Sequence, residues 1–284
     1  MSHREPIGRA MSRRFVLSSG IAGLGALGLG LSTDTGTPVN QAMPLTGNVS
    51  VEQIRSRSRG RPVDMVVMHP RGVDPQGLPV CLMLHGRYGD ALDLVAGVPT
   101  WLSDSFEQQR IPPYTVLAVD GGRTSYWHDD PMTMLLDEVP GWLAERGLGG
   151  PEGRIAAVSG ISMGGFGALL YARRRAEMGD PVRAAGVISP ALFTTWRRMR
   201  TRDAFRNESE WASLDPLRHV DALGDLPLGV WCGNADRFIK GTRRFIRRAQ
   251  PEYASTTPGR HNRAYFRRAL PELVDFVGGH LHDA

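Results

Sequence analysis

The sequence predicts an α/β fold in which helices cover both faces of a mostly parallel sheet. Two observations support this prediction. Short apolar runs of the length of buried strands alternate with stretches whose apolar residues recur at helical spacing. In addition, the chain has 284 residues, 41% of them hydrophobic, which is enough for one large core, and no internal repeat divides it. We therefore expect a single domain over residues 43–284.

The strands and helices are predicted in chain order. A strand over 62–69 is typical of an antiparallel edge. Between 132 and 143 apolar residues recur at helical spacing, and Pro140 should bend or divide that helix. Helices are also expected over 168–175 and 271–277. Buried parallel strands are predicted over 80–84, 114–120, 155–158, 184–189 and 228–232. Since ligands of such sheets bind outside the carboxyl ends of the strands, functional groups are sought there.

The segment 190–227 is rich in large apolar side chains, among them Phe193, Trp196 and Trp211. Two interpretations fit. The segment either forms a small helical cap over an acyl pocket, or consists of amphipathic helices that pack on the sheet. We favour the cap.

The amino-terminal residues 1–42 differ in composition from the rest. Residues 12–17, Ser-Arg-Arg-Phe-Val-Leu, precede an uncharged, small-residue stretch over 18–33. This resembles a twin-arginine export signal, which a receptor reads as an address. No clean cleavage site follows, Ala42 being the best candidate, so the alternative is a retained membrane anchor. We expect a protein exported by this route, either secreted or associated with the cell envelope.

The formal net charge is +5, and Lys240 is the only lysine. Arginine pairs are spread along the whole chain, without the clustering and interleaved aromatic residues of a nucleic-acid-binding surface. No nucleic-acid partner is therefore expected. Compositional bias is our interpretation of the arginine content, and peripheral attraction to an anionic envelope surface remains open.

The two cysteines, Cys81 and Cys232, each lie inside a strand-like apolar run. Two buried parallel strands rarely bring two sulfur atoms into bonding geometry. We expect buried free thiols.

The clearest motif is Gly160-Ile161-Ser162-Met163-Gly164, which follows an apolar run and precedes a helix-forming stretch. In a G-x-S-x-G pattern with this context, the serine occupies a sharp strand-to-helix turn that projects its hydroxyl from the end of the strand. Glycines on both sides relieve the crowding of the turn. Ser162 is therefore a candidate nucleophile.

A serine nucleophile needs a histidine and a carboxylate, which follow it in that fold in the order serine, acid, histidine. Asp236 comes just after the predicted strand 228–232, and we favour it over Asp215, typical of a turn or cap, and over Asp225. Three histidines follow Asp236. His261 lies in a loop before a helical stretch and is the predicted base, whereas His280 and His282 lie in the terminal tail.

Two backbone N–H groups are candidates for stabilising an oxyanion. One belongs to Met163, at the start of the helix, and the other to Arg87, after the strand 80–84. The side chain of Arg87 is either solvated or holds an anionic part of a substrate. Because acyl transfer by such a triad uses only protein groups, we expect no metal and no cofactor.

These motifs together resemble the esterase D branch of the α/β-hydrolases, and within it the antigen-85 mycolyltransferases and their esterase relatives. The resemblance implies a serine esterase or acyltransferase with Ser162, Asp236 and His261 as its triad. It also implies that the loop 121–127 lines the pocket, with Ser125, Tyr126 and Trp127 as substrate-binding residues. The motifs that carry it are 84–87, 120–127, 138–143, 160–165 and 259–261 followed by Leu270-Pro271.

The chain departs from the mycolyltransferases at two positions. Those enzymes hold trehalose with an aspartate before the glycine of the oxyanion loop and an arginine two residues after it, where this chain has His85 and Tyr88. We expect both residues to face Ser162 as substrate-binding groups. The expected function is therefore an exported serine carboxylesterase for small-molecule or lipid esters. Transfer of an acyl group to an envelope sugar or lipid is the alternative, followed by a non-catalytic envelope-binding protein.

Overall fold

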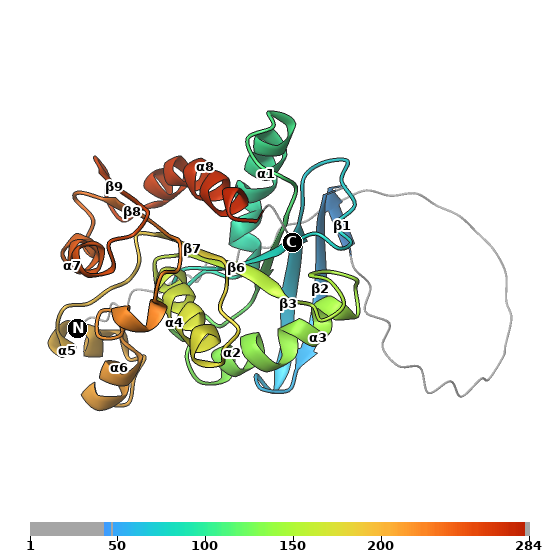
Figure 1. Cartoon of the computed structure of the whole chain (residues 1–284). Helices are drawn as coiled ribbons and strands as arrows, with labels where there is room; N and C mark the ends of the chain where they lie inside the picture. The colour runs from blue at the N-terminus through green and yellow to red at the C-terminus, as the bar shows by residue number, and fades with distance from the viewer. Residues whose placement is uncertain (1–42, 47, 282–284) are drawn as a thin grey trace, which may run out of the picture. The chain divides into compact units, whose positions relative to one another are not determined.

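The computed structural model describes residues 43–46 and 48–281 (Figure 1). The predicted export signal at 1–42 and His282 lie outside the described residues. The described residues belong to one compact unit. Within 43–46 and 48–281, no helix has both the length and the apolar character that crossing a bilayer requires.

The sheet has nine strands within the described residues, in the order β1-β2-β3-β5-β4-β6-β7-β8-β9. The six strands from β5 to β9 in that order are parallel, whereas β1, β2 and β3 are antiparallel. The mostly parallel sheet that was predicted is thereby confirmed. The strands are β1 (Met43–Thr46), β2 (Val49–Ser56), β3 (Arg61–Met68), β4 (Val80–Leu84), β5 (Thr115–Val119), β6 (Ile155–Ile161), β7 (Ala184–Ile188), β8 (Leu228–Gly233) and β9 (Tyr253–Thr257).

Helices cover both faces of the sheet (Figure 1). On one face α1 (Val98–Glu107) and α8 (Arg263–Gly279) pack together, and on the other α4 (Met163–Glu177) lies against β6 and β7. The alternation of strand side chains explains the two layers. Along β4, Val80, Leu82 and Leu84 belong to one apolar cluster and Cys81 and Met83 to the other.

The remaining helices connect these layers. They are η1 (Ala91–Ala96), α2 (Asp130–Thr133), η2 (Met134–Glu138), α3 (Val139–Ala144), α5 (Trp196–Met199), η3 (Arg200–Arg202), α6 (Glu208–Leu214), η4 (Val220–Leu223) and α7 (Ile239–Ala249). Pro140 does divide its helix, because a π-helical turn, η2, ends just before α3 begins. A proline cannot donate the backbone bond of a regular helix, so the ladder shifts there.

Two predictions about elements are wrong. The strand predicted over 62–69 is β3, but it is not an edge, since β2 and β1 pair beyond it. The last helix begins at Arg263, eight residues before Pro271, because the Asn262 side chain accepts the Tyr265 N–H and caps it. Pro271 lies inside the helix and leaves one backbone bond unmade. Both cysteines are free and buried, as predicted.

The segment 190–227 follows β7, and most of its large apolar side chains are part of the protein core. Phe193, Met199, Phe205 and Trp211 are all buried in the same apolar cluster as α4. For these side chains the packing interpretation holds and the cap interpretation does not. Arg202 is different, because it lines the cavity that contains Ser162.

Candidate active site

Ser162 occupies the turn between β6 and α4 with φ 58° and ψ −112°, a conformation that side-chain-bearing residues rarely adopt. Backbone bonds hold the turn in place. The Ser162 N–H donates to the Ile188 carbonyl at 2.9 Å, and the Ser162 carbonyl accepts the Ala191 N–H at 2.8 Å. The strain is therefore maintained by the neighbouring strand β7 and the chain that follows it.

The two flanking glycines permit a close approach of backbones. A Cβ at Gly160 would collide with the carbonyl of Gly164, and a Cβ at Gly164 would collide with the carbonyl of Leu84 at the end of β4. Glycine is needed at both positions because backbone, which cannot move aside, fills the space.

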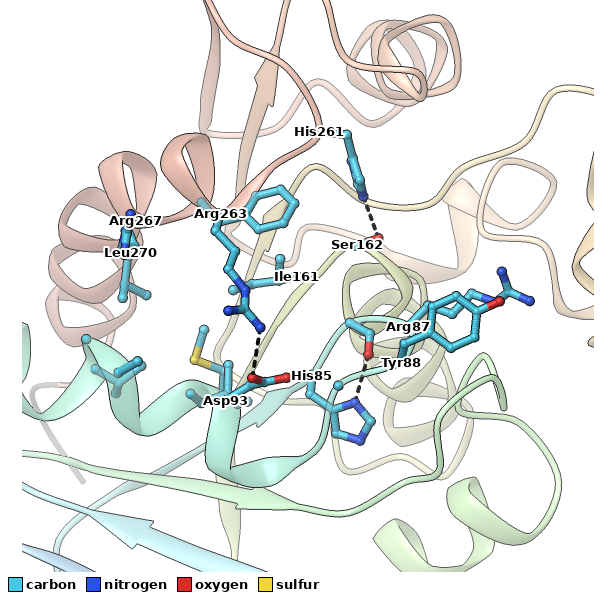
Figure 2. Close-up of a pocket in the computed structure, with 18 of the residues that line it drawn as sticks. His85, Arg87, Tyr88, Asp93, Ile161, Ser162, His261, Arg263, Arg267 and Leu270 are labelled. Atoms are coloured by element: carbon cyan, nitrogen blue, oxygen red, sulfur yellow. Dashed lines mark hydrogen bonds and ion pairs between the residues drawn. The ribbon is translucent and has the colours of Figure 1, made fainter. Parts of the chain in front are cut away.

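Ser162, His261 and Asp236 form a continuous hydrogen-bonded chain. Ser162 Oγ lies 2.8 Å from His261 Nε2 (Figure 2), and His261 Nδ1 lies 2.7 Å from Asp236 Oδ2. A carboxylate only accepts, so Nδ1 carries the proton and Nε2 is left to accept from the serine hydroxyl. This is the protonation state in which the imidazole can take up the serine proton.

The ends of β8 and β9 bring Asp236 and His261 together. The Ala235 N–H donates to the Gly259 carbonyl at 2.9 Å, and the Asn234 N–H to the Thr257 carbonyl at 2.8 Å. Gly233 allows this contact, since a Cβ there would collide with Gly259. Parallel pairing of β8 with β9 thus places the histidine loop beside the carboxylate.

The Asp236 side chain is fully buried. Burial by itself would raise the pKa of this carboxyl, but the hydrogen bond and charge of His261 and the N–H of Phe238 outweigh it and lower the pKa below its ordinary value. Asp236 therefore remains ionised and fixes the orientation of His261. The edges of the Phe238 and His261 rings also meet, with centroids 4.9 Å apart.

The structure does not bring the other candidates to Ser162. Asp215 is buried in the segment 190–227, where its Oδ1 accepts the Leu217 N–H at 3.0 Å, the turn role expected of it. Asp225 is exposed. His280 pairs with Glu252 at 3.1 Å near the end of α8.

Both candidate oxyanion donors lie beside the serine. Met163 is the first residue of α4, so its N–H has no carbonyl partner within the helix. Among the described residues the Arg87 N–H donates to no carbonyl. The preceding residue, Gly86, passes close to the serine, since a Cβ built on it would lie 3.6 Å from Ser162 Cβ.

His85 lines the cavity that contains Ser162, as expected, but its imidazole is engaged within the protein. It is 1% exposed, and both of its ring nitrogens are bonded to backbone. Nε2 accepts the Gly121 N–H at 3.2 Å, so Nδ1 carries the proton and donates to the Gly86 carbonyl at 2.9 Å. Burial lowers the pKa of His85 and keeps it neutral. His85 thus positions the loop of the oxyanion donor and offers no free group to a substrate.

Of the three residues expected to bind substrate in the loop 121–127, only one lines the cavity. Tyr126 lines the cavity, but Trp127 is completely buried, and its indole N–H donates to the His85 carbonyl at 3.2 Å. Ser125 Oγ accepts the Trp127 N–H and does not line the cavity. The substrate-binding role expected for Ser125 and Trp127 is therefore not supported by their positions. Tyr88 does line the cavity and is 58% exposed.

The cavity around Ser162 has a volume of about 490 Å³ and two unlike sides. We call one the apolar side: it lies under η1, α1 and α8 and is lined mainly by Leu94, Val98, Phe266 and Leu270, with Arg267 of α8 beside Leu270 (Figure 2). At its rim Arg263 pairs with Asp93 at 3.4 Å (Figure 2). We call the other the cationic side, lined by Arg87, Arg202 and Arg237.

The charges of the three arginines of the cationic side act on Tyr126, which lines the same cavity. Burial raises the pKa of the Tyr126 hydroxyl to about 12, against the opposing positive charge of Arg202, Arg87 and Arg237. Sequence reasoning named Arg87 but missed Arg202 and Arg237. Arg237 follows Asp236 directly, and this adjacency is the signal that could have identified it.

One group of side chains within the described residues could approach a metal ion. His128, Asp129 and Glu210 offer ligand atoms within 4.8 Å of one another. The His128 Nε2 donates to the Ala204 carbonyl at 2.5 Å, and both carboxylate oxygens of Glu210 already accept from Arg206. Since Arg206 balances the Glu210 charge, this group carries no metal assignment.

Comparisons with solved structures show the same fold. A ferulic acid esterase matches with a TM-score of 0.68 at 17% identity, covering 86% of this chain and 100% of its own. An S-formylglutathione hydrolase from Agrobacterium tumefaciens gives 0.67 at 14%, with 85% and 98% covered. A substrate-bound, fluorophosphonate-binding serine hydrolase of Staphylococcus aureus gives 0.61 at 17%, with 80% and 97% covered. The α/β-hydrolase fold expected from the sequence is thereby confirmed.

A comparison with curated protein sequences gives no match. A family model described as "Putative esterase" matches residues 56–277, which include Ser162, Asp236, His261 and the loop of Arg87. Because the match spans most of the chain, and the fold agrees with it, this protein belongs to the "Putative esterase" family of α/β-hydrolases.

Proposed function

We propose that this protein is an exported serine carboxylesterase that hydrolyses acyl esters through an acyl-enzyme on Ser162. The observation that carries the proposal is the chain of hydrogen bonds from Ser162 Oγ through His261 to the buried Asp236. Its members meet at the carboxyl ends of β6 and β8 and just after β9, where Ser162 and His261 line one cavity and Asp236 is buried behind His261.

The geometry supports the following steps. Ser162 Oγ attacks the ester carbonyl carbon while His261 Nε2 takes its proton, and the N–H groups of Met163 and Arg87 bind the oxyanion. The carbon–oxygen bond to the alcohol breaks, and the alcohol leaves with the proton from His261. A water molecule then attacks the acyl-enzyme, giving its proton to His261, and the acid departs as the proton returns to Ser162.

Replacement of Ser162 tests this mechanism. We expect Ser162→Ala to lower kcat/KM for short p-nitrophenyl esters by about 10⁴-fold or more, since a triad without its nucleophile retains only binding and oxyanion effects. Ser213→Ala is the matched control, because Ser213 is exposed at the end of α6 and lines neither cavity. A fluorophosphonate probe should label the parent protein and the control but not Ser162→Ala. Retention of ester hydrolysis by Ser162→Ala would rule the mechanism out.

Acyl transfer to a sugar remains the second enzymatic possibility from the sequence. His85, at one of the two positions where the resembled mycolyltransferases hold trehalose, has both ring nitrogens occupied by backbone groups. This favours water as the acceptor. Mass spectrometry of products formed with and without trehalose separates the two reactions, and a trehalose ester among the products would overturn the preference for hydrolysis.

Export rests on the sequence of residues 12–33 alone. Fusing residues 1–42 to a reporter that is active only outside the cytoplasm tests it, with Arg13→Lys/Arg14→Lys as the control. We expect the double substitution to abolish reporter activity.

A further inference from the structure

A second cavity adjoins the one that contains Ser162. It has a volume of about 560 Å³, and Arg202, Arg237 and Phe238 line both cavities. The second cavity is formed by the chain after β7 and by the first residues of α7. A ligand whose ester carbonyl lies at Ser162 can therefore extend along a shared wall into this space.

The second cavity is unusually cationic. Six basic side chains line it, and among the residues that the structure describes no aspartate or glutamate does so. Within the same part of the chain none of the six makes an ion pair with a carboxylate. They are Arg197, Arg198, Arg200, Arg202, Arg237 and Lys240.

Several arginines elsewhere in the protein do have a carboxylate partner. Arg61, Arg110, Arg146, Arg173 and Arg175 each pair with a carboxylate at 3.0 Å or less. Compositional bias explains why the chain contains many arginines, but it does not explain why six cations gather where no acid balances them. The only lysine of the chain is one of the six.

Arg202, which lines both cavities, and Arg87, which lines the first, are each fixed by contact with an aromatic ring. The Arg202 guanidinium stacks on the Phe193 ring at 5.2 Å and Arg87 on Tyr88 at 4.4 Å. The Arg87 Nη2 donates to the Arg202 carbonyl at 3.3 Å. The Nε atoms of both residues are buried and make no hydrogen bond to any described residue. A buried donor without an acceptor is costly, and a ligand oxygen would satisfy it.

We infer that the second cavity and the cationic side of the first form a subsite for a phosphate group on the alcohol half of the ester substrate. This inference rests on the proposed esterase function. Arginine recognises phosphate through paired N–H groups, and a dianion balances more of six positive charges than a single carboxylate does. The acyl chain then lies on the apolar side, and Ser162 stands between the two.

A set of matched substrates tests the subsite. Butyryl esters of ethanediol, butanediol and hexanediol are prepared with the far terminal hydroxyl either free or phosphorylated, so that the spacer length varies. For at least one spacer we expect kcat/KM to be about 10- to 100-fold higher for the phosphorylated ester, as one or two charge-assisted bonds would give. Equal rates at all three lengths overturn the inference.

Two charge-matched variants locate the effect. Arg197→Gln/Arg200→Gln removes two cations that line only the second cavity, and we expect the preference for the phosphorylated ester to fall to within about threefold. Arg243→Gln/Arg247→Gln removes two exposed cations of α7 that line neither cavity, and the preference should persist. If the preference for the phosphorylated ester fell equally in both double variants, the overall charge of the protein would explain it and the subsite would be overturned.

Direct binding separates this inference from the proposed function. Calorimetry with Ser162→Ala protein measures the affinity for the uncleaved esters, so it needs no catalysis. The esterase proposal fails if neither ester is hydrolysed in a Ser162-dependent manner, whereas the subsite fails if the paired esters bind equally. If the Arg197/Arg200 variant instead loses only its binding to phosphatidylglycerol vesicles, the cations bind a lipid surface and the substrate assignment is overturned.

Discussion

The loops after β7 and β8 begin side by side in the sheet but use charge in opposite ways. After β8 the chain reaches Asp236 within three residues, and that carboxylate is buried and paired with His261. After β7 it runs through the segment 190–227, which leaves Arg197, Arg198 and Arg200 exposed without a carboxylate partner among the described residues. The carboxylate of the short loop is therefore compensated within the protein, whereas the three arginines of the long loop, like Arg237 beside Asp236, have no carboxylate partner among the described residues.

The largest effect should come from Asp236. In Asp236→Asn the amide N–H₂ would donate to His261 Nδ1, which forces the proton onto Nε2 and prevents it from accepting the Ser162 hydroxyl. We expect kcat to fall by about 10⁴-fold. Hydrolysis of a neutral p-nitrophenyl ester measures it.

Asp215→Asn is the matched control, because it replaces the other buried carboxylate that follows Ser162, in the loop after β7. Its rate should remain within about twofold of the parent, since Asp215 serves a turn at Leu217 and not the cavity. If Asp215→Asn lost as much activity as Asp236→Asn, the contrast between the two loops would collapse.

Asp215, which should have little effect on the rate of hydrolysis, should have a measurable effect on the free energy of unfolding. Burial raises the pKa of Asp215 from 3.8 to about 6, against the weaker opposing effects of the Leu217 N–H, Arg218 and Arg244. Between these two pH values the unfolded chain has released the proton and the folded chain retains it. The folded state therefore loses stability as the pH rises, by at most about 3 kcal/mol.

Asp215→Asn removes this pH dependence, because an amide does not ionise. The amide oxygen can still accept the Leu217 N–H. Denaturant unfolding at pH 4 and at pH 7 measures it: the variant should gain stability relative to the parent protein at the higher pH. Parallel curves for the two proteins would show that Asp215 ionises freely in the folded state.

Salt should produce the smallest effect and act on the cationic subsite only. Raising the ionic strength shortens the distance over which exposed charges attract a ligand, so the preference for phosphorylated esters should fall about three- to tenfold between 50 and 500 mM salt. The preference for longer acyl chains, which depends on the apolar side, should not weaken. A parallel decline of both preferences would contradict the division of the cavity into two unlike sides.

The chemistry of the site could be predicted from the sequence because its members are tied to the ends of strands. Ser162 lies within a motif, Asp236 follows β8, and His261 was the remaining histidine in the right order outside the terminal tail. Gly160 and Gly164 belong to the same five-residue motif as Ser162, so they are recognisable in the sequence although Gly164 contacts the distant Leu84. Fold class and strand positions follow from the same local patterns.

Recognition could not be predicted in the same way. Arg202 reaches the cavity because Phe193, Met199 and Phe205 anchor its segment in the apolar cluster that also contains α4, which is a matter of tertiary packing. The position of Trp127, which does not support the substrate-binding role expected of it, depends on tertiary packing in the same way. Trp127 fills the space between Gly121 and Gly167, and a Cβ on either glycine would collide with its ring or its Cβ. No pattern of residue spacing in the sequence predicts that Trp127 packs between these two glycines.

The strained turn at Ser162 has a consequence for how this sequence would drift if its activity were no longer under selection. Gly160 and Gly164 are required by backbone contacts that exist whether or not the protein catalyses anything. No such contact requires a serine at position 162, where φ is 58°, and a glycine there would adopt this backbone conformation with less strain. In a descendant that has lost its activity, Ser162 should therefore be replaced before the two glycines. A G-x-G-x-G sequence at this turn would then indicate an α/β-hydrolase without esterase activity.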